Sequence, residues 1–194
     1  MEITILIFLL GGLFLGWSLG ANDAANVFGT AVGTRMVSFT TAAIICSIFV
    51  ILGAIISGAG TTETLGKLGA INALPGAFAA CVAAGISVYL MTKVGLPVST
   101  TQAIVGAIVG WNLYTGSSTN IQVLLTILST WILCPIIAGI IAMGLFTFTK
   151  RVILNRKLHI LRLDAYTRTA LLVAGAFGAY SLGANNIANV MGVF

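Results

Sequence analysis

Apolar residues fill the chain in long runs that short polar links separate. Six runs stand out, at residues 3–33, 37–58, 71–92, 96–115, 119–148 and 169–194. A helix needs about 20 residues to cross roughly 30 Å of hydrocarbon, and each run is close to that length or longer. The pattern therefore predicts an all-α integral membrane protein, folded as a polytopic helical bundle.

Composition supports this prediction and excludes other classes of protein. Of the 194 residues 59% are hydrophobic and 7% are charged, and the mean hydropathy is +1.11. A soluble domain carries about 25% charged residues, so this chain is neither a soluble enzyme nor a nucleic-acid-binding protein. Cys46, Cys81 and Cys134 lie singly in apolar runs, and no pairing of His, Cys or carboxylates indicates catalysis. We expect a protein that is no enzyme, that has no resident cofactor and that is surrounded by membrane lipid.

The basic residues predict the orientation. Six of the nine lie in the segment 150–168, the one strongly polar stretch. Suppose that the first five runs cross the bilayer and that the N-terminus lies outside. Of the nine basic residues only Lys67 then lies outside, while Arg35, Lys93 and the six of segment 150–168 lie in the cytoplasm. This arrangement satisfies the positive-inside rule, and a re-entrant 96–115 would spoil it. We expect a multi-pass protein of the plasma (inner) membrane, with Lys150–Arg168 as a cytoplasmic loop.

One motif occurs twice. Residues 17–29, Trp-Ser-Leu-Gly-Ala-Asn-Asp-Ala-Ala-Asn-Val-Phe-Gly, recur at 180–192 as Tyr-Ser-Leu-Gly-Ala-Asn-Asn-Ile-Ala-Asn-Val-Met-Gly, with nine of the thirteen positions identical. An odd number of crossings per repeat makes the two copies antiparallel, which is the inverted-topology repeat of many secondary transporters. We expect a first transmembrane repeat at 1–149, the basic loop at 150–168, and the start of a second, inverted repeat at 169–194. The remaining half of that repeat is then an expected partner.

The first copy of the motif carries an acidic residue inside an apolar run. Gly20 weakens a helix and Asn22 is a good N-cap, so we expect discontinuous helices here, with a second half-helix that starts at Asn22. An aspartate at the bilayer centre costs roughly 2.5–3.5 kcal/mol, so a functional role is the default interpretation of Asp23. Asp23 beside Asn22 and Asn26 forms an oxygen-rich site suited to Na⁺ or H⁺. The structural alternative is that the two asparagines join helices and that Asp23 is a cap.

A second polar cluster follows Pro97. Ser99-Thr100-Thr101-Gln102 fits a capping box, and an apolar helix follows it. Hydroxyl groups, an amide and unsatisfied N–H groups at a helix N-terminus suit a phosphate or sulfate ion. The alternative is a capped transmembrane helix whose hydroxyl groups bond only to backbone.

Both motifs resemble those of the inorganic phosphate transporter (PiT) family. Gly20–Asn26 and Gly183–Asn189 resemble its duplicated G-A-N-D-x-A-N signature, and Gly95–Gln102 resembles its G-x-P-V-S-T-T-[HQ] segment. The resemblance implies a secondary transporter that imports inorganic phosphate with Na⁺ or H⁺, and a homodimer of the complete protein. It assigns phosphate to Asn22, Ser99, Thr100, Thr101, Gln102 and Asn185, and a cation, with Na⁺ favoured, to Asp23, Asn26, Asn186 and Asn189.

The sequence departs from the family at Asn186, where the family usually has aspartate, so the number of coupled cations stays open. We expect alternating access around the two motifs. The alternatives are a transporter of sulfate or another oxyanion, and an anion channel. A channel would need a continuous polar pore, whereas the polar residues here gather at two places.

Overall fold

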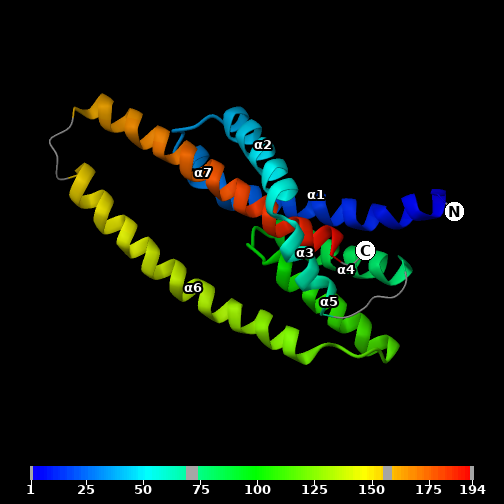
Figure 1. Cartoon of the computed structure of the whole chain (residues 1–194). Helices are drawn as coiled ribbons and strands as arrows, with labels where there is room; N and C mark the ends of the chain where they lie inside the picture. The colour runs from blue at the N-terminus through cyan, green and yellow to red at the C-terminus, as the bar shows by residue number, and fades with distance from the viewer. Residues whose placement is uncertain (1, 69–73, 155–158, 193–194) are drawn as a thin grey trace.

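The computed structural model describes residues 2–68, 74–154 and 159–192, and these ranges are predominantly helical, with no strand. In chain order the elements are α1 (Glu2–Gly33), α2 (Phe39–Ser57), α3 (Ala59–Gly66), α4 (Leu74–Lys93), α5 (Thr100–Thr115), α6 (Ile121–Thr149), η1 (Lys150–Leu154) and α7 (Ile160–Met191). Five described helical segments are long and apolar enough to cross a membrane: Leu6–Gly33, Phe39–Ser57, Leu74–Lys93, Ile121–Val152 and Ile160–Met191. The prediction of an all-α polytopic membrane protein is confirmed (Figure 1).

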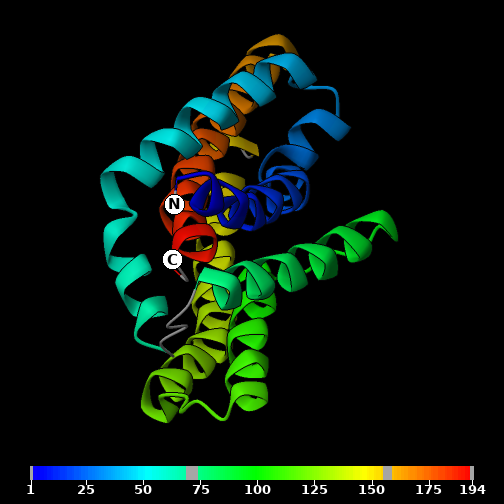
Figure 2. The ribbon, with the colours of Figure 1, turned by 90° about the vertical axis from the view of Figure 1, so that its right-hand side faces the viewer.

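Helices α1 and α7 cross in opposite directions, and the crossing brings the two copies of the motif together (Figures 1 and 2). A methyl group built on Gly16 would touch Val190 at 3.7 Å, and one built on Gly178 would touch Val27 at 3.3 Å. Val27 and Val190 occupy corresponding positions in the two copies. Their contact partners nearly correspond as well, because Gly178 matches Leu15, the residue next to Gly16. Each copy therefore contacts the other in nearly the same way, as an inverted repeat requires.

Two further helices extend this pair. α2 packs along α7, where a Cβ atom on Gly183 would overlap the carbonyl group of Val50. α4 packs along α1, where Phe14 fills the space that a side chain at Gly85 would need. Glycine is thus required at these crossings because two helix backbones, or a backbone and a ring, are in direct contact.

Two separate hydrophobic cores lie along α1. Leu15 and Leu19 belong to a core with α4 and α5, whereas Phe28 and Ala31 belong to a core with α2 and α7. The polar part of the motif, residues 22–26, lies between them on the same helix. The fold therefore places the polar side chains at the junction of two apolar bodies.

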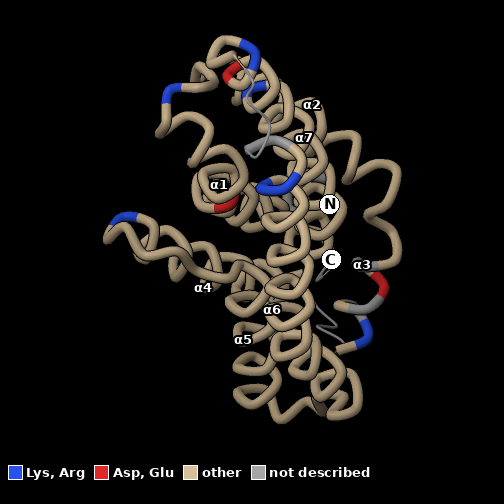
Figure 3. The backbone as a smooth tube through the Cα atoms, turned by 90° about the vertical axis from the view of Figure 1, so that its left-hand side faces the viewer, with Lys and Arg blue, Asp and Glu red and all other residues tan. Residues whose placement is uncertain are grey.

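Helix α6 lies along the edge of the bundle (Figure 1). Ile127 is buried in the core that contains Leu15, but every side chain from Ile132 to Val152 is exposed. These exposed side chains are predominantly apolar, and charged positions lie mainly near the ends of the helices (Figure 3). Such a surface suits hydrocarbon rather than water.

The predicted break in the first run is wrong. α1 continues through Gly20 and Asn22 as one helix of 32 residues, and α7 likewise continues through the second copy. A break would leave backbone groups unsatisfied at several kcal/mol each in an apolar environment, whereas one glycine costs a helix about 1 kcal/mol. The side chain of Asn22 is therefore free for tertiary contacts instead of capping a half-helix.

The predicted loop at 150–168 is also largely helical. Residues 150–154 extend α6 as a π-helical turn, and α7 begins at Ile160, after His159 as its N-cap. Leucine, arginine and alanine dominate the first turns of α7 and have high helix propensity, so the helix extends well before residue 169. Residues 155–158 lie outside the described part of the chain.

The run at 96–115, expected to cross the bilayer, forms a shorter helix that is not among the five span candidates. α5 begins at Thr100 because Ser99 caps it, and its 16 residues give a length of about 24 Å. A non-helical segment at 94–99 precedes it. This segment carries the start of α5 to the crossing of α1 and α7.

Candidate functional site

Five polar side chains are buried where α1, α5 and α7 meet. They are Asn22, Asp23, Thr100, Asn186 and Asn189, and each is 8% exposed or less. Three of them were assigned to a cation and two to phosphate, and all five lie in one hydrogen-bonded network. The structure thus joins the two clusters that the sequence shows as separate.

The Asp23 carboxylate is the centre of this network. Its Oδ2 atom accepts hydrogen bonds from Asn186 Nδ2 at 2.7 Å and from Thr100 Oγ1 at 3.3 Å, and its Oδ1 atom accepts one from Asn22 Nδ2 at 2.9 Å. All three donors are neutral, and no basic side chain bonds to Asp23 in the described part of the chain. The Asp23 carboxyl group therefore has only neutral hydrogen-bond partners in the part of the chain that the structure describes.

Thr100 joins the three helices. Its hydroxyl group donates toward Asp23 and lies 3.5 Å from Asn186 Oδ1, and it accepts from Asn189 Nδ2 at 3.3 Å. Asn189 Nδ2 also lies 3.2 Å from Thr101 Oγ1 and 2.9 Å from Asn186 Oδ1. The start of α5 is therefore held mainly by the second copy of the motif.

Local sequence explains how α5 reaches this position. Pro97 disfavours helix at the residue before it, so the chain stays extended up to Ser99. Ser99 Oγ then accepts a hydrogen bond from the Gln102 N–H at 3.3 Å, and Asn22 Nδ2 donates to the Val98 carbonyl at 2.7 Å. The cap at Ser99 is confirmed, but the other half of the predicted capping box, a bond from the Gln102 side chain, does not occur among the described residues. One bond from α1 fixes the segment just before the cap.

Four of the predicted residues lie at the rim of the network. Ser99, Gln102, Asn26 and Asn185 are exposed. Asn185 Nδ2 lies 3.5 Å from Thr101 Oγ1, whereas the side chains of Asn26 and Gln102 make no hydrogen bond among the described residues. Asn26, expected beside Asp23, is therefore outside the network, and the rim offers polar groups for a ligand.

Sequence reasoning missed one participant in the network, the Val98 carbonyl, and one buried hydroxyl group on the same helix as Asn22, that of Ser18. The Val98 carbonyl was invisible because backbone groups leave no trace in a motif, and Ser18 looked like an ordinary small residue. Ser18 lies one turn before Asn22, is 1% exposed, and its hydroxyl group has no hydrogen-bond partner in the described structure. A buried polar atom without a partner is uncommon. The sequence signal that could have identified Ser18 is its place in an apolar run, one helical turn before Asn22.

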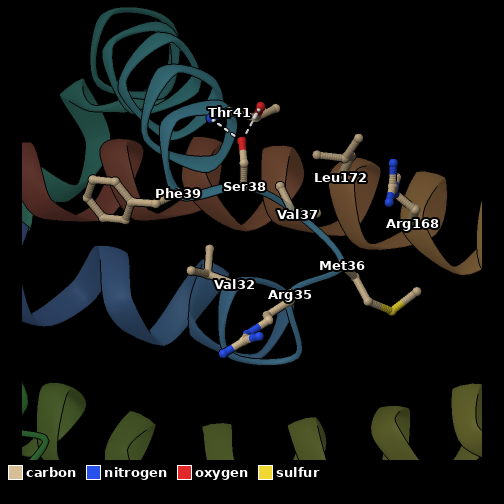
Figure 4. Close-up of a pocket in the computed structure, with 9 residues that line it drawn as sticks. All are labelled: Val32, Arg35, Met36, Val37, Ser38, Phe39, Thr41, Arg168 and Leu172. Atoms are coloured by element: carbon tan, nitrogen blue, oxygen red, sulfur yellow. Dashed lines mark hydrogen bonds between the residues drawn. The ribbon is translucent and has the colours of Figure 1, made fainter.

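A basic hollow lies elsewhere, at the turn between α1 and α2. It has a volume of about 600 Å³, and Arg35 and Arg168 line it with Met36, Val37 and other residues. Figure 4 shows the two arginines on opposite sides of the segment Met36–Val37. None of the residues that line the hollow belongs to the hydrogen-bonded network around Asp23.

The network can hold a hard cation better than it can perform catalysis. It offers one carboxylate together with hydroxyl and amide oxygens, the ligand type that hard cations prefer. No group of three or more His, Cys, Asp or Glu side chains that could hold a metal ion occurs among the described residues. The hydroxyl groups and N–H groups at the start of α5 add donors for an anion.

Comparison with known proteins agrees with these features. The model of a family described as the phosphate transporter family matches residues 19–167. The chain belongs to this family. A relative from Pyrococcus furiosus, named as a phosphate permease, is 37% identical over 164 residues, which are 79% of this chain and 40% of the relative. A relative from Methanocaldococcus jannaschii with the same kind of name is 32% identical over 196 residues, covering 100% of this chain and 61% of the relative.

A solved structure also matches. It is titled the sodium-dependent phosphate transporter, with a TM-score of 0.72 and 25% identity over 91% of this chain and 54% of that chain. The chain therefore spans about half of that structure and about two-fifths of the first relative. Membership of the phosphate transporter family is shown, and the likeness supports the helical membrane fold.

Proposed function

We propose that the protein is the phosphate- and cation-binding part of a secondary active transporter that imports inorganic phosphate, with Na⁺ favoured over H⁺ as the coupled ion. The observation that carries this proposal is the buried Asp23 carboxylate, which is bonded to neutral donors from α1, α5 and α7 at once. A negative charge buried without a positive partner is expensive. A bound cation would remove that cost.

In this proposal the cation binds to the inner part of the network. Asp23, Asn186 and Asn189 supply oxygens, and the amide groups turn their oxygens toward the ion when it enters. Thr100, which the resemblance assigned to phosphate, joins the cation site in this proposal because its hydroxyl group lies 3.3 Å from Asp23 Oδ2. Asn26 would join from the rim. The distances of 2.7–3.5 Å between these side chains are short enough for one ion to contact several of them.

Phosphate would bind at the outer part, next to the start of α5. Ser99, Thr101 and Gln102 lie at a helix N-terminus, where N–H groups and the helix dipole favour an anion. Asn22 and Asn185, one from each copy of the motif, would complete this site. The cation would offset the charge of phosphate, so each ligand would raise the affinity for the other by the same factor.

Alternating access would follow from the two hydrophobic cores. α1 contributes to both, and the polar network lies between them, where two packed bodies can move against each other. In secondary transporters with inverted repeats, binding sites lie at such junctions. We place the N-terminus outside and the basic segment in the cytoplasm, in the plasma membrane.

Phosphate binding in Na⁺ and in K⁺ tests the proposal. The chain, reconstituted in lipid at fixed pH, should bind radiolabelled phosphate more tightly in Na⁺, and Asp23→Asn should remove this difference. Thr101→Val should weaken phosphate more than Na⁺, while Cys134→Ala, on the exposed side of α6, is the control and should change neither. Equal phosphate affinity in Na⁺ and K⁺ would reject Na⁺ coupling, and stronger competition by sulfate than by phosphate would favour the sulfate alternative.

A further inference from the structure

The basic hollow at the turn between α1 and α2 has no role in the proposed transport site. It has a volume of about 600 Å³, and Arg35 and Arg168 are the two charged residues that line it. Both arginines are exposed, and neither forms an ion pair or a side-chain hydrogen bond among the described residues. Asp164, one turn before Arg168 on α7, is not paired with it either. In the described structure both guanidinium groups therefore have N–H donors available for an anion.

Local backbone preference does not explain the arginine at position 35. Its φ angle is +59°, in the left-handed region that glycine and asparagine adopt most readily at the end of a helix. The Arg35 N–H donates to the Val32 carbonyl at 2.9 Å, so the end of α1 fixes this backbone. Arginine thus occupies a position that is unfavourable for its backbone, which indicates a role for its side chain.

The remaining walls of the hollow are mainly apolar. The apolar lining residues are Val32, Met36, Val37, Phe39 and Leu172. Ser38 and Thr41 line it as well, but their hydroxyl groups bond to each other at 2.8 Å, so the arginines are its main donors (Figure 4). Cationic side chains above an apolar wall, at the end of membrane helices, fit the headgroup and the acyl chains of an anionic phospholipid.

The positions of the two arginines favour a headgroup with two phosphates. Figure 4 shows Arg35 and Arg168 on opposite sides of the segment Met36–Val37. A guanidinium group binds one phosphate through two parallel N–H bonds, so two separated guanidinium groups suit two separated phosphates. A lipid with one phosphate, or a free phosphate ion, would leave one of these arginines without a partner.

We propose that this hollow binds a phospholipid with two phosphates in its headgroup, of which cardiolipin is the common example. Arg35 binds one phosphate and Arg168 binds the other, while the acyl chains lie along the apolar wall beside Phe39, a side chain that is 75% exposed. The bound lipid thereby joins the end of α1 to α7. This inference goes beyond the proposed function and does not depend on Na⁺ or on phosphate transport.

Native mass spectrometry of the whole 194-residue chain tests the lipid site. The chain is purified in a neutral detergent and mixed with cardiolipin, phosphatidylglycerol or phosphatidylcholine at equal concentrations of phosphate groups. We expect cardiolipin to be retained more tightly than phosphatidylglycerol, and phosphatidylcholine to be lost. Arg35→Gln and Arg168→Gln should each weaken cardiolipin binding about fivefold, and the double variant about 25-fold.

A second pair of arginines makes the test specific. Arg151→Gln/Arg162→Gln removes the same number of charges outside the hollow, so it should change cardiolipin binding by less than about twofold. All four arginines are exposed, and the melting temperature without lipid should stay the same in every variant.

Four results would overturn the proposal. Equal losses in the two double variants would mean that the lipid responds only to net charge. Cardiolipin that is not retained, or is retained no better than phosphatidylglycerol, would exclude a site for two phosphates. Displacement of cardiolipin by inorganic phosphate at millimolar concentration would assign the hollow to the free ion instead.

Discussion

The two copies of the motif share nine of thirteen residues, yet the protein uses them differently. Asn189 is 1% exposed and bonded to three side chains, while its counterpart Asn26 is exposed and outside the network. Gly183 is in contact with α2, while Gly20 lines a groove. A repeated sequence gives the same helix twice, but the neighbours of each helix decide what its side chains do.

One substitution between the copies changes the charge of the site. Asp23 and Asn186 occupy corresponding positions and bond directly to each other at 2.7 Å. A carboxylate at both positions would place two like charges in contact, which disfavours ionisation of one of them. The amide of Asn186 instead donates to Asp23, so the pair holds one charge in a hydrogen-bonded arrangement.

The largest difference between the copies should appear when alanine replaces the two glycines. Gly183→Ala should prevent normal folding or lower stability by about 1–3 kcal/mol or more, because the added methyl group overlaps the Val50 backbone. Gly20→Ala should be neutral or stabilising by up to about 1 kcal/mol, since alanine favours helix and the position is open. Thermal unfolding in detergent measures both. Equal effects at the two sites would contradict the observed packing of α2 on α7.

Exchanging the charge between the copies should have the next largest effect. Asp23→Asn should reduce Na⁺-dependent phosphate binding to background, and Asn186→Asp should weaken it because two carboxylates then compete for one place. The double variant Asp23→Asn/Asn186→Asp should recover part of the binding, since the exchanged atoms lie 2.7 Å apart. The same radiolabelled phosphate assay applies. A double variant no better than Asp23→Asn would show that the charge must belong to α1.

Truncating the two asparagines should have a smaller effect, on stability. Asn189→Ala removes two interhelical bonds, to Thr100 and Thr101, and one bond within α7, to Asn186. At roughly 0.6 kcal/mol for each interhelical bond in a membrane, the cost should be about 1 kcal/mol. Asn26→Ala removes no hydrogen bond among the described residues and should leave the unfolding free energy within about 0.5 kcal/mol. Chemical unfolding of both variants in the same detergent makes the comparison. A larger cost at Asn26 would show that its side chain has a partner that the described structure lacks.

The sequence predicted the apolar helical runs and singled out the polar side chains that the structure brings together where α1, α5 and α7 meet. Apolar runs of known length give membrane helices because the bilayer fixes the span, and Pro97 and Ser99 place the start of α5 through local backbone preferences. Asp23 was identified because a carboxylate in an apolar run is costly. These are properties of single residues or short segments, so they can be read without coordinates.

The remaining features depend on tertiary contacts. A local reading of Gly20 and Asn22 predicted a broken helix, but the apolar surroundings favour continuous backbone bonding and α1 stays whole. The link between Asn189 and Thr100 joins residues far apart in the chain, and no motif shows it. The inequality of Asn26 and Asn189 is hidden as well, because identical residues in identical motifs differ only in their neighbours.

The smallest expected effect concerns the first position of the motif, where Tyr180 corresponds to Trp17. The Tyr180 hydroxyl group bonds to Ser57 Oγ at 2.6 Å and so ties α7 to the end of α2, while Trp17 packs against the ring of Tyr89 at 5.7 Å. Tyr180→Phe should cost about 0.6 kcal/mol or less, and Ser57→Ala about the same. Tyr89→Phe is the matched control and should cost less, because no hydrogen bond of its hydroxyl group occurs among the described residues.

A double-mutant cycle decides whether this bond exists in the folded protein. If Tyr180 and Ser57 bond to each other, the double variant should unfold with nearly the free energy of either single variant, since one bond can be lost only once. Costs that add would mean that each hydroxyl group bonds elsewhere. The contact between α2 and α7 would then depend on the close packing at Gly53 and Gly183 and not on the Tyr180 hydroxyl group. That hydroxyl group would then not distinguish the second copy of the motif from the first.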